Sequence, residues 1–125
     1  MEEKELAIRR IVPNINFGNL EGSKEFYQDF LGMKLAMDLK WILTFVSKGN
    51  PTAQISILQN DKDEKPDNSS ISISIEVSNV DEMHRRAKKM DLNITYDITN
   101  ESWGVRRFFV QDPNGATLNL LSHSS

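Results

Sequence analysis

The chain contains the same order of predicted secondary structure twice. Alternating apolar and polar residues predict a strand, a helix and three strands, and the order repeats after a polar stretch. Asn19 and Asn79, the residues expected to cap the two helices, lie 60 positions apart. The last strands of the two copies, 54–59 and 117–122, match at an offset of 63. A repeat of this length indicates two copies of one βαβββ unit.

The two predicted units cover about 8–59 and about 70–123. The first has strands over 8–17, 33–39, 41–47 and 52–59 and a helix over about 20–31; the second has a strand over 70–77, a helix from 79 to about 90, a strand over 93–98 and a hairpin over 107–121. That hairpin turns at Asp112-Pro113-Asn114-Gly115. Residues 60–69 contain no apolar residue and are predicted to link the units within a single domain, 1–125.

Neither unit can bury both faces of its sheet alone. We therefore expect an α+β fold in which two βαβββ modules form a curved, mostly antiparallel sheet around a cavity, with the helices on the outer face. The residues predicted to face the helices are Ile15, Phe17, Ile55, Ile57, Ile71, Ile73, Ile75, Leu118 and Leu120. Small polar residues predominate on the opposite side, which favours a semi-enclosed cavity floor over the alternative, a solvated sheet face.

Composition excludes several classes of protein. The 38% of hydrophobic and 26% of charged residues are typical of a globular chain. Because the chain has no cysteine, it cannot form disulfides or thiolate metal sites. A net charge of −3 argues against nucleic acid as a partner. No apolar run approaches membrane-spanning length and residues 1–10 lack a signal-peptide pattern, so we expect a cytoplasmic protein without a membrane partner.

Two segments resemble the vicinal oxygen chelate superfamily. They are Phe26-Tyr27…Leu31-Gly32-Met33 and Trp103-Gly104…Phe109…Asp112-Pro113-Asn114-Gly115…Leu118-Asn119-Leu120. The superfamily includes glyoxalase I, extradiol dioxygenases, fosfomycin-resistance enzymes and the metal-free bleomycin-resistance proteins. The resemblance extends over about 8–123. It implies paired βαβββ modules and a homodimer with cavities at or near the subunit interface.

The metal-ligand positions of that superfamily are altered in this chain. Metal-dependent members carry His, Gln or Glu at one position in the first and last strand of each unit. By the resemblance, these positions fall on Val12, on or near Ser56, on or near Ser72, and on Asn119. A divalent metal needs about three or four good nitrogen or oxygen ligands. Valine offers none, and serine and asparagine are poor ligands. We therefore expect no metal and no cofactor, and we expect His84 and His123 to be surface residues.

The polar face carries residue types suited to ligand binding. Trp41 and Trp103 stand 62 positions apart and could stack on a planar ligand; core or dimer contacts are the alternative. Either Arg106 or Arg107 should point into the cavity, because neighbours in a strand face opposite ways, and it would bind an anionic group. The predicted ligand-binding residues are Trp41, Trp103, Asn14, Asn16, Ser56, Ser72, Ser74, Glu76, Arg106, Phe108 and Asn119, with Tyr96 a weaker candidate.

Two functions fit these residues. The first is a homodimeric binding protein that sequesters a small toxic or antibiotic-like compound, as the resemblance to bleomycin-resistance proteins implies. The second is a lyase, dioxygenase or metal-independent isomerase, with Glu76 as a candidate general base. A lone carboxylate without an orienting partner favours the first.

Overall fold

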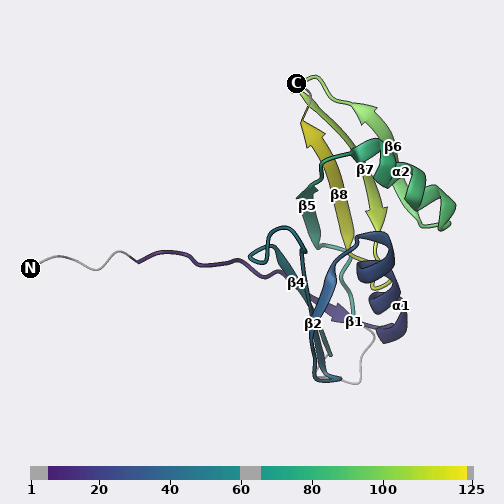
Figure 1. Cartoon of the computed structure of the whole chain (residues 1–125). Coiled ribbons are helices and arrows are strands. Elements are labelled where there is room, and N and C mark those ends of the chain that lie inside the picture. Colours follow the sequence, from purple (N-terminus) through teal and green to yellow (C-terminus); the bar gives the residue numbers. More distant parts are fainter. Residues whose placement is uncertain (1–5, 60–65, 124–125) are drawn as a thin grey trace, which may run out of the picture.

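The computed structural model describes residues 6–59 and 66–123 as two modules of equal topology (Figure 1). The elements of the first module are β1 (Asn14–Phe17), α1 (Leu20–Glu25), the π-helix η1 (Phe26–Phe30), β2 (Lys34–Asp38), β3 (Ile42–Val46) and β4 (Gln54–Gln59). Those of the second are β5 (Ser72–Glu76), α2 (Val80–Lys89), β6 (Ile94–Asn100), β7 (Val105–Gln111) and β8 (Thr117–His123). The predicted α+β fold of two βαβββ modules is confirmed.

Each module has its own four-stranded mixed sheet. The strand orders are β1-β4-β3-β2 and β5-β8-β7-β6, and the two orders are equivalent. In each sheet the first strand runs parallel to the last, and the remaining pairs are antiparallel. Both helices lie on the same side of the sheets in Figure 1. The Arg86 guanidinium of α2 donates to the Phe30 carbonyl at 2.8 Å, which joins the two helical layers.

The helices begin at the predicted caps. Asn19 Oδ1 accepts from the Gly22 amide at 2.9 Å, and Asn79 Oδ1 accepts from the Glu82 amide at 3.1 Å. The first helix differs from the prediction of one continuous α-helix, because it widens into η1 after Glu25. All three aromatic residues of η1, namely Phe26, Tyr27 and Phe30, are buried against the sheet. The helix stops before Gly32, whose φ of +69° suits glycine.

The core is continuous across the modules. It contains apolar residues of both sheets and both helices: Ile15, Phe26, Tyr27, Phe30, Leu43, Phe45, Ile55, Ile57, Val80, Ala87, Phe108, Val110, Ala116, Leu118 and Leu120. The predicted helix-facing residues of β4 and β8 are buried there, whereas Ile71, Ile73 and Ile75 are only half-buried. Ile73 and Ile75 of the edge strand β5 line a cavity, which leaves part of each side chain uncovered.

The first strand is shorter than predicted. Only Asn14–Phe17 pairs regularly with β4, and Ile11 makes an isolated parallel bridge to Ala53. Pro13 interrupts the ladder because it has no amide hydrogen, although its carbonyl accepts from the Ser56 amide at 3.0 Å. Residues 6–10 continue away from the body as an extended segment (Figure 1).

Hydrogen bonds from the turn between β7 and β8 join the second module to the first. Asn114 Oδ1 accepts from the amides of Gly18 and Asn19 at 3.0 and 3.2 Å, and Asn114 Nδ2 donates to Ser23 Oγ at 2.8 Å. Asp112 Oδ1 accepts from the Asn114 amide at 2.9 Å, which closes the turn on itself. The Asp-Pro-Asn-Gly motif therefore has a structural role, since it holds the residues that start α1.

Two further buried contacts complete this junction. The Tyr27 hydroxyl donates to Asp112 Oδ2 at 2.8 Å, and burial, together with the negative charge of Asp112, raises the pKa of Tyr27 well above its usual value. Asn68, which is 1% exposed, donates from Nδ2 to the carbonyls of Asn16 and Asn114 at 2.6 and 2.9 Å. The described end of the predicted linker, 66–69, thus contains a buried residue that connects both modules.

Candidate functional site

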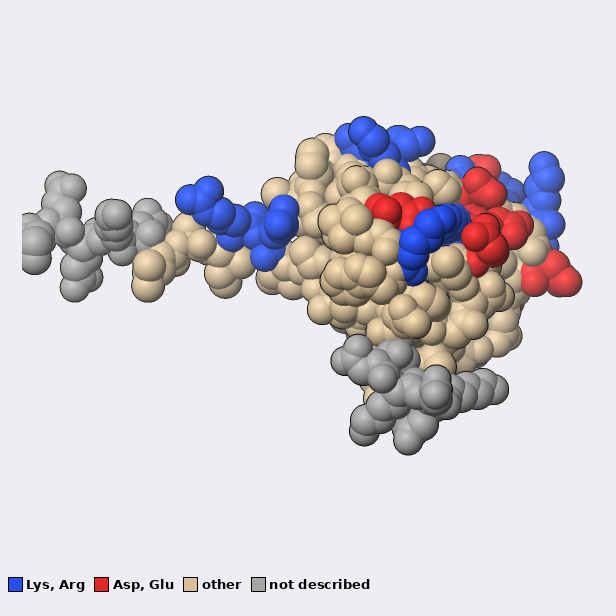
Figure 2. Space-filling view, turned by 90° about the horizontal axis from the view of Figure 1, so that it is seen from below, with Lys and Arg blue, Asp and Glu red and all other residues tan. Residues whose placement is uncertain are grey.

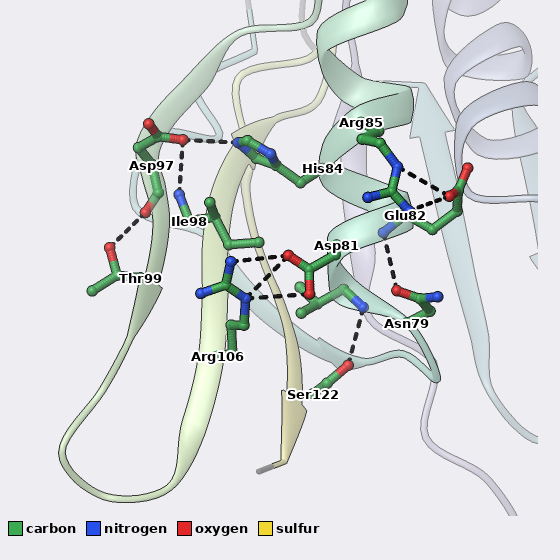
Figure 3. A network of polar contacts seen from close by, with 11 residues as sticks. Asn79, Asp81, Glu82, His84, Arg85, Asp97, Ile98, Thr99, Arg106 and Ser122 are labelled. Atoms are coloured by element: carbon green, nitrogen blue, oxygen red, sulfur yellow. Dashed lines mark hydrogen bonds and ion pairs between the residues drawn. The ribbon is translucent and has the colours of Figure 1, made fainter.

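The contacts of β7 decide which of its side chains face the helices. Arg106 pairs with Asp81 of α2 at 2.9 Å, and this hydrogen bond lowers the pKa of Asp81 (Figure 3). Phe108 is fully buried, and its ring centroid lies 5.1 Å from that of His84. Both residues are therefore on the helix side, and the prediction that Arg106 and Phe108 line the cavity is corrected. The neighbouring residues Arg107 and Phe109 face the other way.

Arg107 lies among three aromatic rings on that opposite face. Its guanidinium carbon is 5.4 Å from the ring centroid of Tyr96, 5.1 Å from Trp103 and 4.8 Å from Phe109. The guanidinium also pairs with Glu101 at 2.8 Å, and Glu101 accepts from the Tyr96 hydroxyl at 3.0 Å. We call these five residues the Arg107 cluster. Trp103 remains 64% exposed, so part of its ring is free to stack on a ligand.

Asn119 lies beside the Arg107 cluster, since it pairs with Phe109 in the sheet register. Its Nδ2 donates to Ser74 Oγ at 3.1 Å. Its Oδ1 is the one buried side-chain oxygen or nitrogen among the described residues that has no hydrogen-bond partner. Leaving such an acceptor unpaired costs about 1–3 kcal/mol, so this oxygen would bind a donor group favourably once neighbouring side chains moved to admit it.

Glu76 has the orienting partner that the sequence interpretation lacked. Its carboxylate is hydrogen-bonded to Nδ1 of His123, and both side chains are exposed. When Nδ1 carries the proton it donates to the carboxylate, and Nε2 is then the ring nitrogen that faces away from Glu76. His123 was predicted to be a surface residue, and its side chain is exposed, but its contact with Glu76 was not predicted. In a strand, alternate residues share a face. His123 therefore lies on the same face of β8 as Asn119 and Leu121, and the sequence could have indicated this.

The predicted site residues of the first module lie on the other sheet. Asn14 and Asn16 are exposed in β1, and Trp41 is 52% exposed in the turn before β3. Ser56 is buried and shares a hydrogen bond of 2.9 Å with Thr44. No side-chain hydrogen bond found between described residues joins these side chains to the Arg107 cluster. The structure thus gathers Ser74, Glu76, Trp103 and Asn119 on one module, with Ser72 exposed on the same strand as Ser74.

A cavity of about 680 Å³ is lined by residues of both modules. We call it the intermodule cleft. Its first-module wall includes Ile11, Leu31, Met33 and Gln54, and its second-module wall includes Ser74, Glu76 and Met83. A volume of this size falls within the range of about 300–1,000 Å³ that small-molecule sites occupy. Ser74 and Glu76, two of the predicted site residues, therefore border both the cleft and the face that carries Asn119.

Residues at the positions that hold metal ligands in the vicinal oxygen chelate superfamily are not suited to bind a divalent cation. Ser56 already bonds Thr44, Ser72 and Asn119 offer a hydroxyl and an amide, and Val12 offers no donor. In residues 6–59 and 66–123, no group of three or more His, Asp or Glu side chains is arranged to hold a metal ion. Within the same ranges, no helix is both long enough and apolar enough to cross a bilayer.

Comparisons with known proteins agree on one family. Residues 8–120 match the family model described as Glyoxalase/Bleomycin resistance protein/Dioxygenase superfamily. A lactoylglutathione lyase of Neisseria meningitidis serogroup A is 30% identical over 121 residues, which cover 89% of this chain and 88% of that protein.

Solved structures show the same fold at low sequence identity. A member of the Glyoxalase/bleomycin resistance protein/dioxygenase superfamily from Sphaerobacter thermophilus superposes with a TM-score of 0.74 at 21% identity, over 94% of this chain and 98% of that one. A glyoxalase/bleomycin resistance protein/dioxygenase from Alicyclobacillus acidocaldarius gives a TM-score of 0.72 at 20% identity, over 93% and 92% of the two chains.

Proposed function

This chain belongs to the glyoxalase/bleomycin resistance protein/dioxygenase superfamily, and from that premise we propose that it is a metal-independent binding protein of the cytoplasm. Its ligand is a small planar compound with hydrogen-bond donors, of the toxic or antibiotic-like kind, and it acts as a homodimer. The ligand is held and sequestered without any bond being made or broken.

One observation carries the metal-independent part of the proposal. By the resemblance, the four positions at which metal-dependent relatives carry ligands fall on Val12, on or near Ser56, on or near Ser72, and on Asn119; these side chains are an isopropyl group, two hydroxyls and an amide. This set contains neither an imidazole nor a carboxylate. These side chains cannot hold a cation. The polar groups of the site would therefore contact a ligand directly.

The second module supplies those direct contacts. Trp103 offers an exposed aromatic face held in place by Arg107, and Asn119 offers an acceptor that no side chain of the described residues satisfies. Trp103 lies in the turn between β6 and β7, and Asn119 lies in β8, the strand next to β7. A planar ring stacked on Trp103 with an N–H or O–H directed at Asn119 Oδ1 would use both features. Arg107 is already paired with Glu101, so it orients Trp103 more than it offers a free positive charge.

Fluorescence of Trp103 provides the test of this binding mode. In a Trp41→Phe background Trp103 is the sole tryptophan, and a screen of planar aromatic compounds should find saturable quenching. Replacing Trp103 by alanine should weaken the affinity of any such compound by about 1–3 kcal/mol, measured by calorimetry, while the thermal midpoint stays unchanged. Loss of folding in that variant would indicate a core role for Trp103 and would contradict the proposal.

The Glu76–His123 pair favours a second candidate function. A histidine oriented by a carboxylate is a common general base, and here it stands on the strands that carry Ser74 and Asn119. The superfamily includes lyases, isomerases and dioxygenases, and the Neisseria relative is named a lactoylglutathione lyase. Assays of lactoylglutathione lyase activity on the purified chain, with His123→Asn as the matched variant, separate the two functions. Turnover that His123→Asn abolishes would replace sequestration by catalysis.

A further inference from the structure

The intermodule cleft meets the face that carries Trp103 at Ser74 and Glu76, but other residues form most of its walls. Among the described residues, neither Asn119 nor any member of the Arg107 cluster lines it. We propose that the cleft is a second binding site, for a small aliphatic carboxylate, with the alkyl chain held between the modules and the carboxylate held by α2. The inference goes beyond the proposed function, because it concerns a different site and a different class of ligand.

Aliphatic side chains from both modules form the apolar walls of the cleft. They pack against the core but remain partly exposed: Leu31, Met33, Ile73, Ile75, Val77 and Met83. Within the described ranges no aromatic ring lines the cleft, whereas three rings surround the guanidinium of Arg107. Methionine side chains are flexible and polarizable, so Met33 and Met83 can adapt to chains of different shape. The cleft therefore favours an alkyl chain over a planar ring.

Arg86 places a positive charge where the two walls meet. Its guanidinium donates to the carbonyl of Phe30 at 2.8 Å, and Phe30 directly precedes Leu31 of the first-module wall. Met83 lies three positions earlier in α2, so it shares a face of the helix with Arg86. The Arg86 side chain is itself partly buried. An amphipathic molecule could therefore lay its alkyl chain along Met83 and Leu31 while its charged end meets the guanidinium.

The charge of the ligand follows from which groups of the cleft are already paired. Glu76 is bonded to His123, Glu82 accepts from Arg85 at 2.5 Å, and both glutamate side chains are more than half exposed. By contrast, no carboxylate of the described residues lies within ion-pair distance of Arg86. A guanidinium has five N–H donors, and one backbone carbonyl occupies only part of that capacity. A carboxylate matches the geometry of the remaining donors.

The surrounding surface does not select the sign of a ligand. Figure 2 shows acidic and basic side chains next to one another on the body of the protein, in mixed regions. Hydrogen bonding to Arg85 lowers the pKa of Glu82, and the charges of Arg85 and Arg86 add to this effect, so Glu82 is negative near neutral pH. It would repel a carboxylate that stayed at the mouth of the cleft, which favours direct contact with Arg86.

Compounds with one alkyl chain and different head groups test the ligand class. Octanoate should bind the full chain saturably, measured by calorimetry, whereas octanol and octylamine should bind at least about tenfold more weakly, because they form no charge-assisted hydrogen bond with a guanidinium. Hexanoate should bind about tenfold more weakly than octanoate, since each buried methylene contributes a factor of about three to four. No saturable binding of octanoate, or octanol or octylamine binding as tightly, would overturn the proposal.

Variants of α2 test the position of the site. Arg86→Gln should weaken octanoate binding at least about tenfold, whereas Lys88→Gln, which removes the same charge from an exposed position of this helix, should leave it unchanged. Because Arg86 also joins the helical layers, Met83→Glu is a second variant, which adds a carboxylate to the apolar wall and keeps that bond. It should also abolish binding. Thermal midpoints without ligand show that each variant is folded, and unchanged affinity in either one would overturn the proposal.

Trp103→Ala distinguishes this site from the proposed ligand site. The variant should bind octanoate as the parent chain does, and octanoate should not displace a compound that quenches Trp103 fluorescence. Loss of octanoate binding in Trp103→Ala, or such displacement, would overturn the assignment of a second site. Failure of every planar compound to quench Trp103, with octanoate binding intact, would contradict the proposed function alone.

Discussion

Removal of the Asn114 side chain should weaken the contact between the two modules and lower the stability of the fold. Asn114→Ala eliminates hydrogen bonds to the Gly18 and Asn19 amides, to Ser23 Oγ and, at 3.2 Å, to Asp112 Oδ2. The residue is only 8% exposed, so water replaces these partners poorly. The start of α1 would lose the acceptor that holds it against the turn between β7 and β8.

The contacts set the size of the effect. Each lost hydrogen bond is worth about 1 kcal/mol net, and a buried group left without a partner adds further cost, so we expect a loss of about 3–5 kcal/mol in the free energy of unfolding. Urea unfolding followed by circular dichroism measures it. With a slope of about 2 kcal/mol per molar, the midpoint should fall by about 2 M while the slope stays constant.

A second asparagine provides the matched control. Asn119 makes one side-chain hydrogen bond, to the exposed Ser74, and carries the unpaired Oδ1. Asn119→Ala should not destabilise the chain, because it removes a hydrogen bond worth about 1 kcal/mol together with an unpaired oxygen whose burial costs about 1–3 kcal/mol, while binding of a ligand found in the Trp103 screen should weaken. If the urea midpoint of Asn114→Ala equals that of the parent chain, the hydrogen bonds of this turn do not stabilise the contact between the modules.

Three other changes have defined outcomes. The raised pKa of Tyr27 means that the unfolded chain loses this proton first, so stability should be full below about pH 10 and should fall as pH rises above it; urea midpoints of Tyr27→Phe should lack that decline. Phe108→Ala should cost about 3–5 kcal/mol in stability, since its ring is wholly inside the core, and a binding defect without a stability defect would place it in the site instead. Arg107→Gln should shift the emission of Trp103 by removing the guanidinium 5.1 Å from its ring, whereas Arg106→Gln should not.

Sequence periodicity was sufficient for the architecture. The doubled order of elements and the two asparagine caps correspond to the observed helices and strands, because each signal depends on neighbouring residues. The shortened β1 departs from the prediction. The strand was predicted to begin at Ile8, but the alternation of apolar and polar residues starts only at Asn14, and regular pairing with β4 starts at the same residue.

The facing of β7 could not be read from its own residues. Arg106 and Arg107 are adjacent, as are Phe108 and Phe109, so both faces of the strand would carry one arginine and one phenylalanine in either register. The choice is made by α2, where Asp81 receives Arg106 and His84 packs on Phe108. These contacts join residues far apart in the sequence, and no local pattern encodes them.

Polar contacts between residues far apart in the sequence were the other feature that the sequence did not predict. Asn68 lies in a wholly polar run, NDKDEKPDNS, which predicts a solvated linker, yet its amide holds β1 to the second module. The partner of Glu76 was also missed, because His123 is 47 residues away and meets it only through the parallel pairing of β5 with β8.

The metal content of the purified chain tests the central claim most directly. The chain would be incubated with Zn²⁺, Mn²⁺ or Fe²⁺, dialysed and analysed by mass spectrometry, beside Asn119→Ala. We predict far less than one ion per chain in both proteins, because the family's ligand positions hold valine, serine and asparagine. One tightly held ion per parent chain, lost in Asn119→Ala, would contradict a receptor that works without a cation.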